Sequence, residues 1–291
     1  MGLFDESFLV RIERLFLVSR KMAAGRQQAF RRARRLGAGL EVADYRPWVQ
    51  GDNLRDVDWN YYASTREMIV RLFEEEEDLH IYLLVDVSGS MRVGDGRKFD
   101  VGRRIAGALS YIGLSNLDRV SVVPFGEDTM GYLPPSRGRS QIWKVFRFLE
   151  RDIPAPRTNT EQSFRRFVAQ TRRRGLAVVI SDFHDPSGFV EGLNYLRFHR
   201  FEPIVIQVFD ESDQRPTLHG DLDLVDCETG DIVPVTVTPA LLDAYRQAHA
   251  DAMAELEEFC RSRNVLYLRT PVQTPFEDLI LRIFRMGGFL R

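Results

Sequence analysis

Apolar and polar positions change their period along the chain, and this change predicts its architecture. From residue 79 onward, short runs of consecutive apolar residues alternate with longer segments in which apolar residues recur every three or four positions. The short runs are typical of strands buried on both faces of a sheet, and the longer segments of amphipathic helices. We expect strands over residues 79–86, 119–125, 129–133, 176–182, 203–209 and 265–269, and helices over residues 98–115, 140–151, 160–174, 188–200, 239–263 and 275–287. This alternation predicts an α/β fold with a doubly wound, mostly parallel sheet of the Rossmann type.

The N-terminal part of the chain follows a different pattern. Residues 5–24 place apolar side chains on one helical face and basic ones elsewhere, which predicts an amphipathic helix. The apolar face carries Phe8, Ile12, Leu15 and Phe16. Residues 42–71 mix aromatic residues, glycine and charges, so we expect loops and short strands there, with one strand over residues 67–73.

These patterns predict two parts of unequal size. Residues 1–78 form a smaller α+β segment, and residues 79–291 form the main domain. Within the main domain, residues 221–238 contain turn residues between two alternating runs, which predicts an inserted β-hairpin before the long helix.

Composition excludes several classes of protein. The net charge of −2 gives no overall basic field of the kind that attracts nucleic acid. The two cysteines, Cys227 and Cys260, form no CxxC motif, so a disulfide scaffold or a structural zinc site is not expected, and we predict two buried thiols in a reducing cytoplasm. No apolar run approaches the roughly 20 residues of a membrane span. We therefore expect a cytoplasmic protein with no membrane span and no nucleic acid partner.

Residues that could bind a metal ion lie where the first strand of the main domain ends. That strand runs directly into Asp86-x-Ser88-x-Ser90, and the strand over 176–180 ends at Ser181-Asp182. Ligands of α/β sheets bind at the carboxyl ends of the strands. Carboxylate and hydroxyl oxygens suit a hard cation such as Mg²⁺, with Mn²⁺ or Ca²⁺ as alternatives, rather than zinc. Because hydroxyls are neutral, such a site is expected to attract an acidic group from elsewhere, although a Ser/Gly turn without a metal remains an alternative.

A third stretch adds a hydroxyl near the same edge. The sequence Arg157-Thr158-Asn159-Thr160 opens the helix predicted over residues 160–174. Either threonine, taken alone, is more typical of a helix N-cap, and Asp182 alone is as typical of a turn as of a metal site. The coincidence of three such stretches favours a site, with Thr158 preferred over Thr160 as the ligand.

These residues resemble a known domain. Asp86, Ser88, Ser90, Thr158 and Asp182 are similar to the metal-ion-dependent adhesion site of von Willebrand factor A domains, in which the serines and the threonine bind Mg²⁺ directly or through water. Upstream, the sequence contains Gly51-Asp52-x-x-Arg55-x-x-Asp58-Trp59 and Val70-Arg-Leu-Phe-Glu-Glu-Glu76. The two upstream stretches resemble the bacterial family called domain of unknown function 58, which joins such a motif to a von Willebrand factor A-like domain.

The resemblance implies a function in protein binding. A partner's Asp or Glu would complete the Mg²⁺ site, and the implied partner is a MoxR-type AAA+ ATPase in chaperone-like maturation or assembly of other proteins. The enzymatic alternative is a metal-dependent phosphoester hydrolase that uses Asp86, but Ser88 stands where phosphatases of the haloacid dehalogenase type have a second Asp. For the Gly51–Trp59 motif we expect a structural role, with Arg55 three residues from both Asp52 and Asp58 and able to bond either.

Overall fold

The computed structural model describes residues 2–17, 42–54, 57–73, 79–153, 155, 157–185 and 187–285. Its internal contacts divide the chain into two compact units. The larger unit combines Met1–Lys21 with Leu79–Arg291, and the smaller unit is Met22–Asp78. Met1–Lys21, which includes the N-terminal helix, groups with Leu79–Arg291 and not with the segment that follows it.

A six-stranded sheet forms the centre of the larger unit. Its strands are β3 (His80–Asp86), β4 (Arg119–Phe125), β5 (Leu133–Ser136), β6 (Leu176–Ser181), β7 (Glu202–Phe209) and β10 (Leu266–Pro271). They lie in the order β10-β7-β6-β3-β4-β5, and all neighbouring pairs are parallel except β4 and β5. The prediction of a mostly parallel α/β sheet is confirmed.

The strand order reverses direction at β3. The chain passes from β3 to β4 and then β5 on one side, and returns to place β6 on the other side of β3. In an open α/β sheet, the carboxyl ends of strands at such a reversal flank the usual ligand-binding crevice. The residues that follow β3 and β6 therefore lie at a favourable place for a site.

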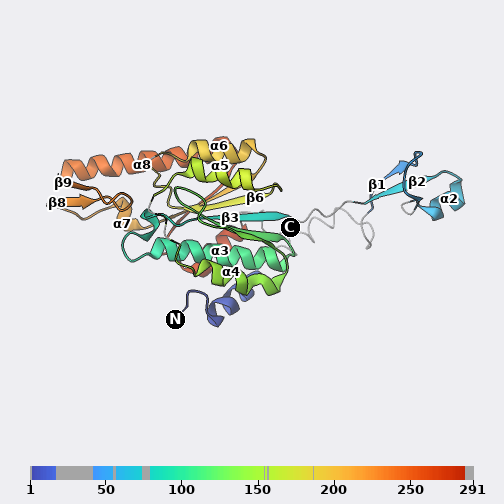
Figure 1. Ribbon diagram of the computed structural model, residues 1–291, viewed down its shortest axis with the longest axis horizontal. Helices are drawn as coiled ribbons and strands as arrows, with labels where there is room; N and C mark the ends of the chain where they lie inside the picture. Colours follow the sequence, from blue (N-terminus) through green and yellow to red (C-terminus); the bar gives the residue numbers. More distant parts are fainter. Residues whose placement is uncertain are drawn as a thin grey trace. The chain divides into compact units, whose positions relative to one another are not determined.

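Helices cover both faces of the sheet (Figure 1). One face carries α3 (Arg97–Ser115), α4 (Ile142–Leu149), α9 (Phe276–Arg285) and the helix over residues 6–17, and the other carries α5 (Thr160–Gln170), α6 (Val190–Phe198) and α8 (Pro239–Ser262). The two buried clusters are the cores beneath these two helical layers. Phe8, Ile12, Leu15 and Phe16 are all buried in the first of them, so the predicted apolar face of the N-terminal helix is confirmed.

The remaining elements show where the sequence patterns were less informative. The short strand expected over residues 129–133 is displaced to β5, and only an isolated bridge joins Thr129 to Phe125. A short helix, α7 (Glu211–Gln214), follows β7 and had no periodic signal because it is only one turn long. The predicted hairpin is present as β8 (Gly220–Val225) and β9 (Ile232–Val237), which form a two-stranded sheet of their own. Two 3₁₀ turns, Ser90–Arg92 and Arg139–Gln141, precede α3 and α4.

The smaller unit contains β1 (Val42–Pro47), α2 (Trp59–Thr65) and β2 (Ile69–Phe73), with β1 and β2 antiparallel. Both aspartates of its Gly-Asp motif make structural hydrogen bonds. Asp52 receives two 2.7 Å bonds from the Arg46 guanidinium, and Asp58 caps α2 by accepting the N–H of Asn60 at 3.0 Å. The expected structural role fits these contacts, while the position of Arg55 lies outside the described residues.

Within the described part of the chain, no helix is long and apolar enough to cross a bilayer.

Candidate functional site

Asp86 ends β3 and is buried where the carboxyl ends of β3 and β6 lie side by side. Its side chain is 1% exposed, and both of its oxygens accept hydrogen bonds. The N–H of Ser88 donates to Oδ1 at 2.9 Å, and the Ser181 hydroxyl at the end of β6 donates to Oδ2 at 2.5 Å. Ser181 Oγ in turn accepts the N–H of Phe183 at 2.8 Å. The ends of the two strands are thus tied together through this carboxylate.

A row of oxygens leads from this point to the second carboxylate. Ser88 Oγ lies 3.0 Å from Ser90 Oγ, and Ser90 donates to Asp182 Oδ1 at 3.2 Å. All three side chains are buried. Neighbouring oxygens around an octahedral Mg²⁺ at about 2.1 Å would lie roughly 3.0 Å apart. The donor set, mainly hydroxyls, and its spacing therefore fit a hard divalent cation. Among the described residues, no group of three or more His, Cys, Asp or Glu side chains could hold a metal ion.

A buried lysine neutralises Asp182. Lys98, in the first turn of α3, places Nζ 2.8 Å from Asp182 Oδ2 and 2.8 Å from Asp213 Oδ2. His184 lies on the same carboxylate, with Nδ1 3.2 Å from Oδ2. Asp182 thus faces the serine row with one oxygen and two basic side chains with the other.

The electrostatics of the two aspartates differ because their neighbours differ. Burial, with the charge of Asp182 adding to it, raises the pKa of Asp86 above its ordinary value. Burial alone would also raise the pKa of Asp182, but the contacts of His184 and Lys98 outweigh it and hold that pKa below its ordinary value. The same ion pair raises the pKa values of Lys98 and His184 against the opposing effect of their own burial. Asp182 is therefore the permanently charged member of the site.

Thr158 reaches the site through a residue of the hairpin. Its hydroxyl donates to Glu228 Oε1 at 2.8 Å, and its N–H donates to Glu228 Oε2 at 3.0 Å. Glu228 belongs to the turn between β8 and β9, and this turn also lies against the serine loop. A Cβ built on Gly89 would be 2.7 Å from the Cys227 carbonyl oxygen and 3.4 Å from Glu228 Cγ.

The contacts of Thr160 differ from those of Thr158. Thr160 is buried against α6, where its methyl group would lie 2.9 Å from a Cβ placed on Gly192. Asn159, between the two threonines, is the helix cap and accepts the N–H of Gln162 at 2.8 Å. The capping role belongs to Asn159, which neither alternative had named, and Thr158 stays the predicted ligand.

Several residues of this site were not identified from the sequence. Lys98 and Asp213 come from distant segments of the chain, and no motif in the sequence marked either of them. Glu228 lies in a turn whose approach to Thr158 depends on the tertiary fold. The expectation of two buried thiols is wrong for Cys227, which is exposed in this turn, whereas Cys260 is buried.

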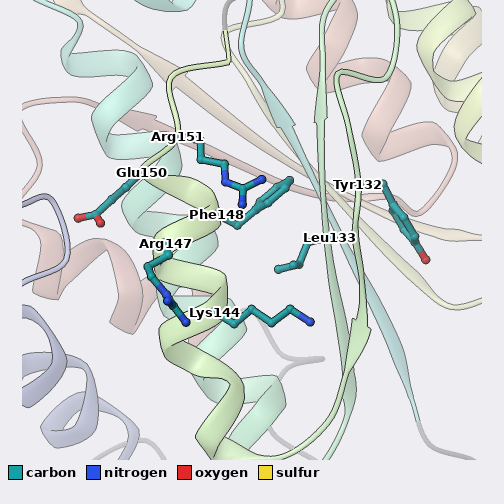
Figure 2. A pocket seen from close by; sticks show the side chains of 7 residues that line it. All are labelled: Tyr132, Leu133, Lys144, Arg147, Phe148, Glu150 and Arg151. Carbon is teal, nitrogen blue, oxygen red and sulfur yellow. The ribbon is translucent and has the colours of Figure 1, made fainter.

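A separate groove lies between β5 and α4 (Figure 2). It is lined by Tyr132, Leu133, Lys144, Arg147, Phe148, Glu150 and Arg151. None of the candidate site residues lines this groove, so it is distinct from the candidate site at the ends of β3 and β6.

Comparison with protein families places the chain. The family model described as "Protein of unknown function DUF58" matches residues 44–255. The chain belongs to this family. Its relatives include the uncharacterized protein Rv1480 of Mycobacterium tuberculosis strain H37Rv, which is 29% identical over 241 residues, covering 80% of this chain and 76% of the relative. The uncharacterized protein MAV169 of Mycobacterium avium is 37% identical over 101 residues, covering 34% of this chain and 59% of the relative.

Solved structures with a similar fold are more distant. BatB from Bacteroides thetaiotaomicron aligns with a TM-score of 0.45 and 15% identity, over 72% of this chain and 98% of that one. An aerotolerance-related membrane protein from Bacteroides fragilis aligns with a TM-score of 0.43 and 17% identity, over 72% of this chain and 100% of that one. At this identity and TM-score, the two alignments carry no conclusion about this chain.

Proposed function

We propose that this member of the DUF58 family is a non-enzymatic, Mg²⁺-dependent protein-binding module of the von Willebrand factor A type. Asp86, Ser88, Ser90, Thr158 and Asp182 would form its metal-ion-dependent adhesion site. The observation that carries the proposal is the spacing of the oxygens of Ser88, Ser90 and Asp182, at 3.0 and 3.2 Å, at the carboxyl ends of β3 and β6. The bound ion would present positive charge to an acidic side chain of another protein.

The environment of Asp86 supports binding rather than catalysis. A nucleophilic carboxylate needs an accessible oxygen that can approach the substrate. Asp86 is 1% exposed, and each of its oxygens already accepts a hydrogen bond, from Ser88 and from Ser181. His184, the nearest histidine, has its Nδ1 on Asp182. These contacts suit a carboxylate that positions the loop and neutralises an ion.

The partner we propose is a MoxR-type AAA+ ATPase, with a role in chaperone-like maturation or assembly of other proteins. This choice rests on the resemblance of the motifs at residues 51–59 and 86–90 to those of proteins thought to act with such ATPases. The chemistry of the site requires only that the partner offer an exposed Asp or Glu.

Binding of the purified full chain to the purified ATPase of the same organism tests the proposal. Biolayer interferometry in Mg²⁺ and in EDTA should show binding only with Mg²⁺. Ser88→Ala should weaken it roughly 10- to 100-fold, the usual effect of losing a residue in or around a metal's ligand shell. Ser212→Ala, which removes an exposed hydroxyl in α7, is the matched control. Equal binding in EDTA with no effect of Ser88→Ala would refute the proposal.

The hydrolase alternative makes an opposite prediction for the same protein. It requires Mg²⁺-dependent cleavage of p-nitrophenyl phosphate that Asp86→Asn abolishes. We expect no cleavage above the level of the variant.

A further inference from the structure

The β8–β9 hairpin approaches the candidate site from outside the main sheet. Its two strands pair only with each other among the described strands, and most of its residues are exposed. Figure 1 shows it at one end of the larger unit, beside the first part of α8. An isolated two-stranded hairpin is only marginally stable in water. Because the hairpin pairs with no other described strand, its position depends on the contacts that its tip makes with the rest of the domain.

The tip holds one carboxylate in a fixed direction. Asp226 Oδ1 accepts the N–H groups of Glu228 at 2.7 Å and Thr229 at 3.0 Å, and Gly230 supplies the positive φ of +76° that closes the turn. Residues 223–234 are otherwise exposed, and Glu228 alone among them is partly buried. The turn is thus organised to present Glu228 to the body of the domain.

Glu228 contacts the candidate cation site through Thr158. Both of its oxygens accept hydrogen bonds from Thr158, at 2.8 and 3.0 Å. The neighbouring Cys227 carbonyl lies so close to Gly89, between the two serines of the site, that only a glycine leaves it room. The carboxylate therefore bonds the proposed threonine ligand, and its side chain lies against the loop that carries Ser88 and Ser90. In the proposed function, an acidic side chain from another protein would have to reach this same position.

We propose that Glu228 is a built-in acidic ligand of the cation site, which closes the site in the resting protein and is displaced when a partner's carboxylate binds. The inference rests on the proposed function, because it needs a cation at Asp86, Ser88, Ser90 and Asp182. It goes beyond that function by assigning the hairpin a role as a gate. It also makes partner binding a competition between two carboxylates for one ion.

Calorimetric titration of Mg²⁺ into the full chain gives the first test. Glu228→Gln should weaken Mg²⁺ binding roughly 10- to 100-fold, as loss of a residue in or around a metal's ligand shell does. Asp223→Asn removes the same charge from an exposed position of the same hairpin and should leave the affinity unchanged. Equal affinity of wild type and Glu228→Gln would overturn the inference and leave the metal site in place. Absence of Mg²⁺ binding by the wild type would instead overturn the proposed function, and the inference with it.

Hydrogen exchange of residues 220–238 gives a second readout that does not depend on affinity. Mg²⁺ should slow exchange at the hairpin tip in the wild type but not in Glu228→Gln. Gly89→Ala should also release the tip, since its backbone (φ −58°, ψ −41°) accepts alanine while the new methyl group would lie 2.7 Å from the Cys227 carbonyl. Both variants should bind the acidic partner more readily in saturating Mg²⁺. If the hydrogen-exchange rate at the wild-type hairpin tip is the same with and without Mg²⁺, the proposed role of the hairpin as a gate is contradicted.

Discussion

Replacement of Lys98 by methionine is the sharpest test of the electrostatics at the site. Lys98 is 3% exposed and bridges Asp182 and Asp213, each at 2.8 Å. Methionine has nearly the same length but no charge, so the substitution removes the cation and leaves the packing volume. Asp182, with a fully buried side chain, would then retain only His184 as a basic neighbour.

The expected cost is about 3–5 kcal/mol of unfolding free energy, the range for breaking a buried ion pair by removing one partner. The loss should depend on pH. In the wild type, the lowered pKa of Asp182 means that its carboxylate contributes stability above the pKa of the unfolded chain, and that this contribution is lost as pH falls through the folded pKa. Without Lys98, the pKa of Asp182 moves back toward its ordinary value, while the pKa of His184, which the charge of Lys98 lowers, rises further. A group with a raised folded pKa stabilises the protein at low pH and loses that contribution as pH rises, so the variant recovers stability as pH falls and His184 becomes protonated. The deficit should therefore be larger at pH 8 than at pH 5.

Urea unfolding followed by far-UV circular dichroism measures this difference, because most of the described helices belong to the larger unit. Lys144→Met, which removes an exposed lysine from α4, is the control and should change stability by less than about 0.5 kcal/mol. A deficit for Lys98→Met that equals the control, or that is the same at pH 8 and pH 5, would refute the reasoning.

Three further predictions concern other parts of the chain. Arg46→Gln should return the pKa of Asp52 from about 2 toward its ordinary value, because the Arg46 hydrogen bonds are the main cause of the shift, and a ¹³C NMR titration of the carboxyl group measures it. Ellman's reagent should modify Cys227 in the folded protein and leave Cys260 intact, because burial raises the pKa of Cys260 to about 12. Phe8→Ala should cost the larger unit about 3–5 kcal/mol, because its ring is buried in the core.

Each of these predictions has a clear contrary result. An unchanged pKa for Asp52 would show that Arg46 does not bond it in solution. Two reactive thiols before unfolding would contradict the burial of Cys260. Val10→Ala alters an exposed position of the same helix as Phe8 and is its control, so equal stabilities of Phe8→Ala and Val10→Ala would show that this helix is not part of the core.

The sequence predicted the parts of this fold that depend on local periodicity. Strand β4 lies where its apolar run indicated, and helix α3 begins one residue before its expected start. The hairpin was recognised from its turn residues. Strand β5 was displaced because Leu133-Pro-Pro-Ser136 has no alternation to fix its register. The joining of the N-terminal helix to the main core depends on contacts across more than a hundred residues, such as that between Phe8 and Phe146, which no local pattern encodes.

The residues of the candidate site also fall into those that the sequence could predict and those that it could not. Asp86, Ser88 and Ser90 follow one another on a single loop, and Asp182 ends the adjacent parallel strand, so sheet topology alone brings them together. Lys98 and Glu228 lie beside them only because α3 and the hairpin fold back over the same end of the sheet. Their positions follow from tertiary structure.

Calorimetric titration of Mg²⁺ into the full chain, with the Ser88→Ala and Ser90→Ala variants beside it, tests the central claim most directly. The account predicts saturable binding of one Mg²⁺ per chain and roughly 10- to 100-fold weaker binding in each variant. No binding by the wild type, or equal binding by wild type and both variants, would contradict it.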